Sequence, residues 1–338
     1  MIKAKILADS INEDGNRLTT FEVEFPRYIL SEYNTHRHFS RNAASTRAIP
    51  ILKQLELIET SPAMPIYYGK NQAGMSASEE LDEAAKQQCI SIIDEMRVFC
   101  ISKVRELQGL GLHKQHAGRY VEAWQTVKGV VSSTEWANWY WLRDHEAAQP
   151  EIADLARKMK VEYDASIPEL LKAGEYHLPY VLSCYHEDEG QKFIVDDEQG
   201  TGFFVTTEQA IKVSAARCAA VSYRNEDYTL EKCLQLYDRL VGDERKHSSA
   251  LEHQATPMND YLWGGLTKEE RNETNIGNIV YWKHSSEHTY TNIPSKPHTW
   301  QEGVSHTDKQ GNLWSGNFKG WVQHRKTING ECYNDLQQ

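Results

Sequence analysis

The sequence lacks an apolar stretch long enough to cross a membrane, and its first residues show no apolar run typical of a signal peptide. We therefore expect a cytoplasmic protein with no membrane partner. Basic residues are in the minority, because 37 Lys and Arg face 48 Asp and Glu and give a formal net charge of −11. This charge argues against binding of a nucleic-acid polymer, which needs a basic face. It leaves room for a small basic pocket that holds one phosphorylated metabolite.

Paired cysteines are also missing. The six cysteines are scattered, and none forms a CxxC pair, which argues against a zinc site or a redox pair and fits reduced thiols. P-loop, GxGxxG and GxSxG motifs are absent from the sequence as well. His284, Glu287 and His288 imitate a metal-binding face, but they lie in a region without helical pattern. We therefore expect no metal site.

Hydrophobic periodicity predicts an α+β protein. Alternation predicts strands at 2–8 and 19–25. Helical spacing and capping residues predict helices at 28–35, 78–107, 113–126, 134–143, 150–173, 207–223 and 228–241.

Two halves are predicted from the middle of the chain. The acidic, glycine-containing stretch 187–202 is interpreted as a link or hairpin between an N-terminal half, 1–185, and a C-terminal half, 203–338. Residues 258–315 show little helical periodicity and are interpreted as a long insertion. The segment 317–325 then returns to a strand followed by a polar motif.

The segment 35–47, THRHFSRNAASTR, combines three arginines with small polar residues and contains one large apolar side chain, Phe39. Guanidinium groups and hydroxyls are the groups that hold phosphate without a metal. Most arginine-rich stretches are solvated loops, and that remains the alternative. The position directly after a strand and a short helix favours an anion site.

Four further motifs carry polar side chains at regular spacing. They are Gln115-His-Ala-Gly-Arg119, Asn138-Trp-Tyr-Trp-Leu-Arg143 followed by Ala148-Gln-Pro-Glu-Ile152, Ser214-Ala-Ala-Arg-Cys-Ala-Ala-Val-Ser-Tyr223 with His247-Ser-Ser-Ala-Leu-Glu-His253, and Gln323-His-Arg325. Each has a plainer interpretation. Arg143 could form a salt bridge with Asp144 or Glu146. The 247–253 segment could start a helix, with a serine cap and Glu252 completing a capping box, although a helix start also binds anions.

Together these motifs resemble those of the flavin-dependent thymidylate synthases, the thymidylate synthase complementing proteins. That family has an Arg-His-Arg signature followed after seven residues by Ser. Thr35 replaces the first Arg of the signature, Ala153 replaces the closing Arg of the Ala-Gln-x-Glu-Ile-Arg motif, and Gln323-His-Arg325 resembles a second, degraded copy. The element expected first lies at 214–253. The chain therefore resembles long phage-type relatives with a permuted motif order.

The resemblance implies a flavin-dependent thymidylate synthase-like fold, with an antiparallel or mixed sheet and long helices. It implies FAD-dependent reductive methylation of dUMP to dTMP, with the folate methylenetetrahydrofolate as carbon donor and NADPH as reductant. The residues implied for dUMP are Ser45, Arg47, Arg119 and Arg143. Arg143 is also the catalytic candidate, because an arginine beside uracil can stabilise developing negative charge. The residues implied for FAD are His36, Arg37, Asn42, Asn138, His247, Ser249, Glu252, His253, Gln323, His324 and Arg325.

The resemblance also implies a homo-oligomer. Sites of this family form between the subunits of a tetramer, and two signature copies in one chain would allow a dimer. Two alternatives for function stay open. One is hydroxymethylation or another C5 modification of a pyrimidine deoxynucleotide on the same scaffold. The other is a non-catalytic nucleotide- or flavin-binding protein, which the departures at Thr35, Ala153 and Gln323 suggest.

Overall fold

The computed structural model describes residues 2–196, 200–221, 229–242, 246–258, 275–276, 279–280, 306–309 and 312–331. Helices and sheets alternate along this part of the chain, and the predicted α+β class is confirmed. His284, Glu287 and His288, and most of the predicted insertion 258–315, lie outside the described residues. The division into halves 1–185 and 203–338 stays a prediction.

A five-stranded mixed sheet forms the centre, with strand order β3-β4-β2-β1-β5. Neighbouring strands are antiparallel except for β5, which runs parallel to β1. The strands are β1 (Lys3–Asn12), β2 (Arg17–Pro26), β3 (Ser40–Ala43), β4 (Thr126–Ser133) and β5 (Glu169–Leu171).

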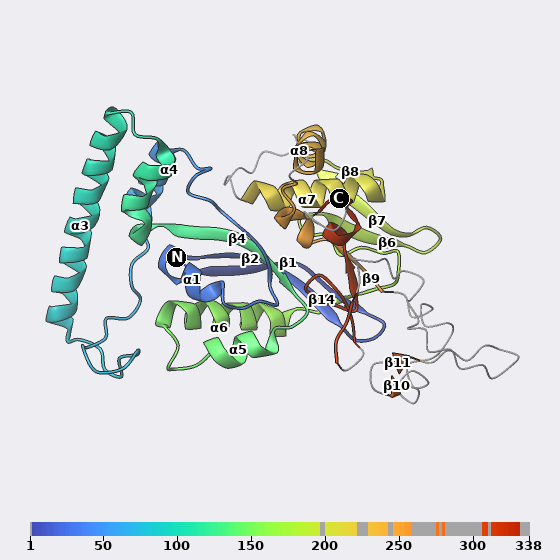
Figure 1. Ribbon diagram of the computed structural model, residues 1–338, viewed down its shortest axis with the longest axis horizontal. Helices are drawn as coiled ribbons and strands as arrows, with labels where there is room; N and C mark the ends of the chain where they lie inside the picture. The colour runs from blue at the N-terminus through green and yellow to red at the C-terminus, as the bar shows by residue number, and fades with distance from the viewer. Residues whose placement is uncertain are drawn as a thin grey trace, which may run out of the picture.

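One face of this sheet is packed by α5 (Ala137–Arg143) and α6 (Pro150–Ala165), which lie beneath it in Figure 1. Successive side chains of a strand point to opposite faces, so Phe21, Val23 and Phe25 of β2 all face these helices. They belong to the largest buried cluster, which also contains Val127, Val131, Trp136, Trp139, Ile152, Leu155, Ala156 and Met159. Burial of this apolar area is the main force that holds α5 and α6 to the sheet.

A second layer lies above the other end of the sheet in Figure 1. It contains α7 (Thr207–Ala220) and α8 (Leu230–Gly242), and α7 begins with a capping box between Thr206 and Gln209. A small antiparallel sheet packs against α7 and is formed by β6 (Leu182–His186), β7 (Gly190–Asp196) and β8 (Gly202–Val205).

A third group of helices stands at the left of Figure 1. It comprises α2 (Ile51–Thr60), α3 (Glu83–Gly109), α4 (Lys114–Ala117) and the 3-10 helix η2 (Gly118–Trp124). Their shared core contains Ile51, Leu55, Ile58, Ile101, Val104, Val121 and Trp124. A short helical turn, η1 (Arg27–Ile29) followed by α1 (Leu30–Tyr33), joins β2 to the 35–47 segment.

The C-terminal segments return to the central sheet. β15 pairs antiparallel with β9, and this pairing brings residues 321–323 beside 255–257. The elements are η4 (Ser249–Glu252), β9 (Ala255–Pro257), β10 (Asn275–Ile276), β11 (Ile279–Val280), β12 (His306–Thr307), β13 (Leu313–Ser315), β14 (Phe318–Lys319), β15 (Trp321–Gln323) and η6 (His324–Thr327).

Most predicted elements are confirmed, but two predicted helices are shorter and several elements were not predicted. The helix predicted at 150–173 ends at Ala165, because Pro168 disfavours helical backbone at the residue before it, and β5 follows. The helix predicted at 113–126 is α-helical only over Lys114–Ala117. The hairpin interpretation of 187–202 is confirmed, since this stretch contains β7, which pairs antiparallel with β6 and β8. Helix α2 and strands β3, β4, β5, β6 and β8 were not predicted.

We predict that Trp139→Ala will lower the free energy of unfolding by about 3–5 kcal/mol, the usual cost of removing a large buried aromatic ring. Trp139 is 1% exposed in the main core, whereas its neighbour Trp141 is 76% exposed. Trp141→Ala is therefore the matched control and should change stability by about 0.5 kcal/mol or less. Urea denaturation measures both. Equal losses for the two variants would contradict the position of α5.

Candidate functional site

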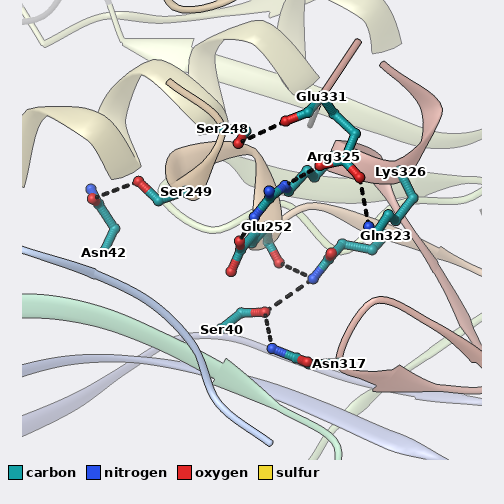
Figure 2. Close-up of polar contacts among 10 residues, drawn as sticks. All are labelled: Ser40, Asn42, Ser248, Ser249, Glu252, Asn317, Gln323, Arg325, Lys326 and Glu331. Carbon is teal, nitrogen blue, oxygen red and sulfur yellow. Dashed lines mark hydrogen bonds and ion pairs between the residues drawn. The ribbon is translucent and has the colours of Figure 1, made fainter. Parts of the chain in front are cut away.

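The C-terminal motif contacts the 247–253 segment through charged side chains (Figure 2). Arg325 forms an ion pair with Glu252, and its Nε donates to Glu331 Oε2 at 2.6 Å. Lys326 Nζ lies 2.6 Å from the other oxygen of Glu331. Burial raises the pKa of Glu252 despite its pairing with Arg325. Burial alone would also raise the pKa of Glu331, but hydrogen bonds from Lys326 and Arg325 lower it. The positive charges of Arg325 and Lys326 are thus paired with the carboxylates of Glu252 and Glu331.

The N-terminal signature joins the same cluster through β3. Gln323 Nε2 donates to Ser40 Oγ at 3.0 Å and to the carbonyl oxygen of Glu252 at 3.0 Å. Ser249 Oγ donates to Asn42 Oδ1 at 3.3 Å. Ser40 and Asn42 are two positions apart on β3 and therefore lie on one face of the strand. The structure thus brings together five residues predicted for FAD: Asn42, Ser249, Glu252, Gln323 and Arg325 (Figure 2).

The first part of the 35–47 segment is held by its own side chains. Thr35 Oγ1 donates to the carbonyl of Glu32 at 2.7 Å, and Arg41 Nη1 donates to the carbonyl of His36 at 3.1 Å. Phe39 is buried and packs against Trp136, with the ring centroids 4.7 Å apart. One apolar anchor therefore fixes a turn whose remaining side chains are polar.

Arg143 lies in a second cluster beside this turn. Its Nε donates to His36 Nε2 at 2.9 Å, its Nη2 donates to Thr35 Oγ1 at 3.3 Å, and its Nη1 forms an ion pair with Glu32. Burial and the nearby charge of Arg143 lower the pKa of His36 to about 4, so its imidazole is neutral near pH 7. The salt bridges considered from the sequence are not those formed, because Asp144 pairs with Arg157.

The residues predicted for the nucleotide phosphate lie at the other end of the segment. Arg119 Nη1 donates to Glu122 Oε1 at 2.7 Å, and Thr46 Oγ1 reaches the same oxygen at 3.3 Å. Ser45 and Arg47 flank Thr46, and the side chain of Arg47 is exposed. Ser45, Arg47 and Arg119 therefore share one corner of the molecule. Arg143 belongs to a different cluster within this chain.

Three predicted FAD residues stand outside these clusters. Within the described part of the chain, no side-chain hydrogen bond ties Arg37, Asn138 or His247 to them, and all three side chains are exposed. His324 is half-buried, and its Nε2 lies 3.0 Å from the hydroxyl of Tyr237. Burial lowers the pKa of His324 to about 4.

A buried polar chain crosses the central sheet. His253, predicted for FAD, is its one predicted member and is fully buried; sequence reasoning missed the others. His253 Nδ1 lies 2.8 Å from Ser132 Oγ, which lies 2.6 Å from Thr20 Oγ1. Thr20 Oγ1 lies 2.8 Å from His177 Nε2, and His177 Nδ1 lies 2.9 Å from Ser10 Oγ. Among the described residues, His253 Nε2 has no hydrogen-bond partner. The members of this hydrogen-bonded chain are far apart in the sequence, so only their positions in the folded protein reveal it.

Two global properties concern the described residues only. No three or more of their His, Cys, Asp and Glu side chains are arranged to hold a metal ion. None of their helices combines the length and the apolar character required to cross a membrane.

We predict that the free energy of unfolding falls as the pH drops below about 6.5. Burial lowers the pKa of His177 and of His253 to about 3 in the folded protein. The unfolded chain binds protons near pH 6.5, so between pH 7.5 and 5.5 it gains protons that the folded protein does not bind. Each histidine should then cost about 1 kcal/mol of stability at pH 5.5.

Urea denaturation at both pH values measures this effect. Burial also lowers the pKa of His36 and of His324 to about 4, so four histidines contribute. His177→Gln should therefore reduce the pH-dependent loss by about a quarter, whatever its effect on stability at pH 7.5. His186→Gln is the control, because that side chain is exposed, and it should leave the pH dependence unchanged. An unchanged slope in the His177 variant would show that this imidazole is not held neutral.

Comparison with known proteins found similar solved structures and a match to one family model. Among solved structures, the UMP/dUMP methylase PolB from Streptomyces cacaoi bound with 5-Br UMP is 14% identical, with a TM-score of 0.41 over 48% of this chain and 88% of that chain. Thymidylate Synthase X from Helicobacter pylori with FAD and dUMP is 18% identical, with a TM-score of 0.30 over 43% of this chain and 67% of that chain. A search of curated proteins found no match. Residues 18–169 match the family model of the thymidylate synthase complementing proteins.

Proposed function

We propose that the protein is a flavin-dependent enzyme that modifies C5 of dUMP. The proposed reaction is reductive methylation to dTMP, with methylenetetrahydrofolate as carbon donor and NADPH as reductant. The observation that carries the proposal is the extent of the family match, which spans 18–169. This range contains the 35–47 segment, Arg119 and Arg143, and so includes every residue predicted for dUMP.

The side chains present fit an FAD molecule in their donor chemistry. Arg37, His247 and Ser249 are exposed donors, and a guanidinium beside hydroxyl and imidazole groups suits the polar parts of a dinucleotide. Arg325 fits less well as a phosphate ligand, because Glu252 and Glu331 already neutralise it. When bound, FAD would supply the hydride that reduces the transferred carbon.

Arg143 is the residue proposed to act on the uracil ring. A guanidinium has five N–H donors, and the contacts with His36, Glu32 and Thr35 use one each on Nε, Nη1 and Nη2. Among the described residues, one N–H on each terminal nitrogen is left for a uracil carbonyl. The neutral His36 accepts from Arg143 without competing for its charge. The cluster therefore holds Arg143 in a fixed orientation, which favours stabilisation of negative charge in the ring.

Two buried cysteines do not favour a route through a thiolate. Cys218 lies in the 214–223 motif and is fully buried, and burial raises its pKa. Burial also raises the pKa of Cys233. Because the thiolate is the nucleophilic form, these thiols are inert at neutral pH. This supports a cofactor-based reaction over attack by either of them.

We predict that the purified protein, reconstituted with FAD, shows a flavin spectrum that NADPH bleaches and dUMP perturbs. Incubation with dUMP, methylenetetrahydrofolate and NADPH should then yield dTMP, measured by chromatography. Formation of 5-hydroxymethyl-dUMP instead of dTMP would show that the reaction is hydroxymethylation. Absence of flavin binding after reconstitution would exclude both reactions and leave a flavin-independent nucleotide-binding protein.

We also predict that Arg143→Ala reduces dTMP formation by roughly 100-fold, because a donor to the developing charge is removed. The flavin spectrum of the variant should be unchanged. Arg157→Ala is the matched control. Arg157 is exposed and pairs with Asp144, the residue that follows Arg143 in the sequence. The Arg157 variant should keep turnover within twofold of wild type. Unchanged dTMP formation in the Arg143 variant would refute its catalytic role.

A further inference from the structure

Three donors from separate segments converge on one carboxylate oxygen, Glu122 Oε1. Arg119 Nη1 lies 2.7 Å from it, Thr46 Oγ1 lies 3.3 Å from it, and Arg27 Nε lies 3.3 Å from it. Arg27 follows β2, Thr46 lies in the 35–47 segment, and Arg119 and Glu122 lie on η2. We call these four residues the Glu122 hub.

The hub is exposed on one side to a surface cleft of about 400 Å³. Arg27 and Glu122 line this cleft, together with Tyr28, Leu30, Ser31, Asn34 and Ala123. The side chains of Arg27 and Glu122 are only 16% and 27% exposed. This ion pair is therefore partly desolvated, while a small molecule can still approach it. Arg47 adds a third guanidinium next to Thr46. The Glu122 carboxylate therefore pairs with two guanidinium groups, Arg27 and Arg119, in a protein whose net charge is −11.

The donor set around Glu122 Oε1 is that of an oxyanion site. Guanidinium groups and a hydroxyl that point at one oxygen would serve a phosphate oxygen equally well. A phosphate carries up to two negative charges and three acceptor oxygens, against one charge and two oxygens on a carboxylate. A phosphate at this corner would thus bind Arg27, Thr46 and Arg119 more strongly than Glu122 does.

We propose that the Glu122 hub is the phosphate subsite of the nucleotide site, that Arg27 and Thr46 are ligands of the nucleotide phosphate, and that Glu122 is an internal counter-anion which the phosphate displaces. The proposal rests on the proposed function, because it extends the set Ser45, Arg47 and Arg119. It adds two ligands and gives Glu122 a specificity role: a nucleoside without phosphate cannot displace the carboxylate and gains nothing from the hub.

Substitution of Glu122 by Gln removes the competing charge and keeps an acceptor oxygen for Thr46 and Arg119. Calorimetric titration with dUMP and with inorganic phosphate should show about tenfold tighter binding to Glu122→Gln than to wild type. Deoxyuridine affinity should not change. The gain should shrink between 50 and 500 mM salt, since exposed charges are screened. Glu106→Gln, which removes an exposed carboxylate paired with Lys103 on α3, is the control and should bind as wild type does.

Arg27→Ala provides a second, opposite test. It should weaken dUMP binding about tenfold and leave deoxyuridine binding unchanged, with Arg27→Lys intermediate because lysine keeps the charge but loses the planar donor pair. If Glu122→Gln does not fold, as judged by circular dichroism, the Arg27 variants decide the question. Unchanged or weaker phosphate binding by a folded Glu122→Gln protein, or wild-type dUMP affinity in Arg27→Ala, would overturn the proposal.

Failure of the hub and failure of the proposed function give different results. If the wild-type protein forms dTMP but Glu122→Gln binds dUMP no more tightly than wild type, the proposed reaction stands and the role of the Glu122 hub is refuted. If the protein binds no flavin and forms no dTMP, but Glu122→Gln binds inorganic phosphate more tightly than wild type, the anion subsite stands and the proposed reaction is refuted. The phosphate titration therefore does not depend on turnover.

Discussion

The antiparallel pairing of β2 with β4 is the constraint on which the rest of the structure depends. It runs without a register shift from Thr19 opposite Ser133 to Pro26 opposite Thr126. At one end the pairing places Thr20 beside Ser132 in the buried polar chain. At the other it brings Arg27, whose amide donates to the carbonyl of Gln125, next to η2 and the Glu122 hub. A shift by one residue would turn Phe21, Val23 and Phe25 away from α5 and α6.

The 35–47 segment contacts three separate clusters. His36 contacts Arg143, Ser40 and Asn42 contact the C-terminal motifs, and Thr46 contacts Glu122. The turn around Phe39 and the short strand β3 divide the segment between these contacts. Its polar side chains therefore have three sets of partners within the chain. The residues predicted for dUMP are split between two of the clusters.

The sequence predicted local features well and distant partners poorly. Alternation identified β1 and β2, and helical spacing identified α3, because these signals depend on neighbouring residues. β4 was missed because Lys128, Gly129 and the serines at its end interrupt its apolar pattern. Arg143 was paired with nearby Asp144 or Glu146, whereas its partner Glu32 is 111 positions away. Motif matches did select Asn42, Ser249, Glu252, Gln323 and Arg325, five residues that the fold brings together.

The contact between Gln323 and Ser40 also bears on how the protein is made. The two residues are 283 positions apart, and Gly316, with φ +56°, leaves room for the Gln323 side chain where any Cβ would lie 2.2 Å from it. The β1–β2 hairpin and α3 rely on local contacts and can form early in synthesis, whereas a contact over this separation has a large loop-closure cost. The chain around Ser40 therefore emerges from the ribosome long before its partner, and water satisfies these polar groups in the nascent protein until β15 arrives.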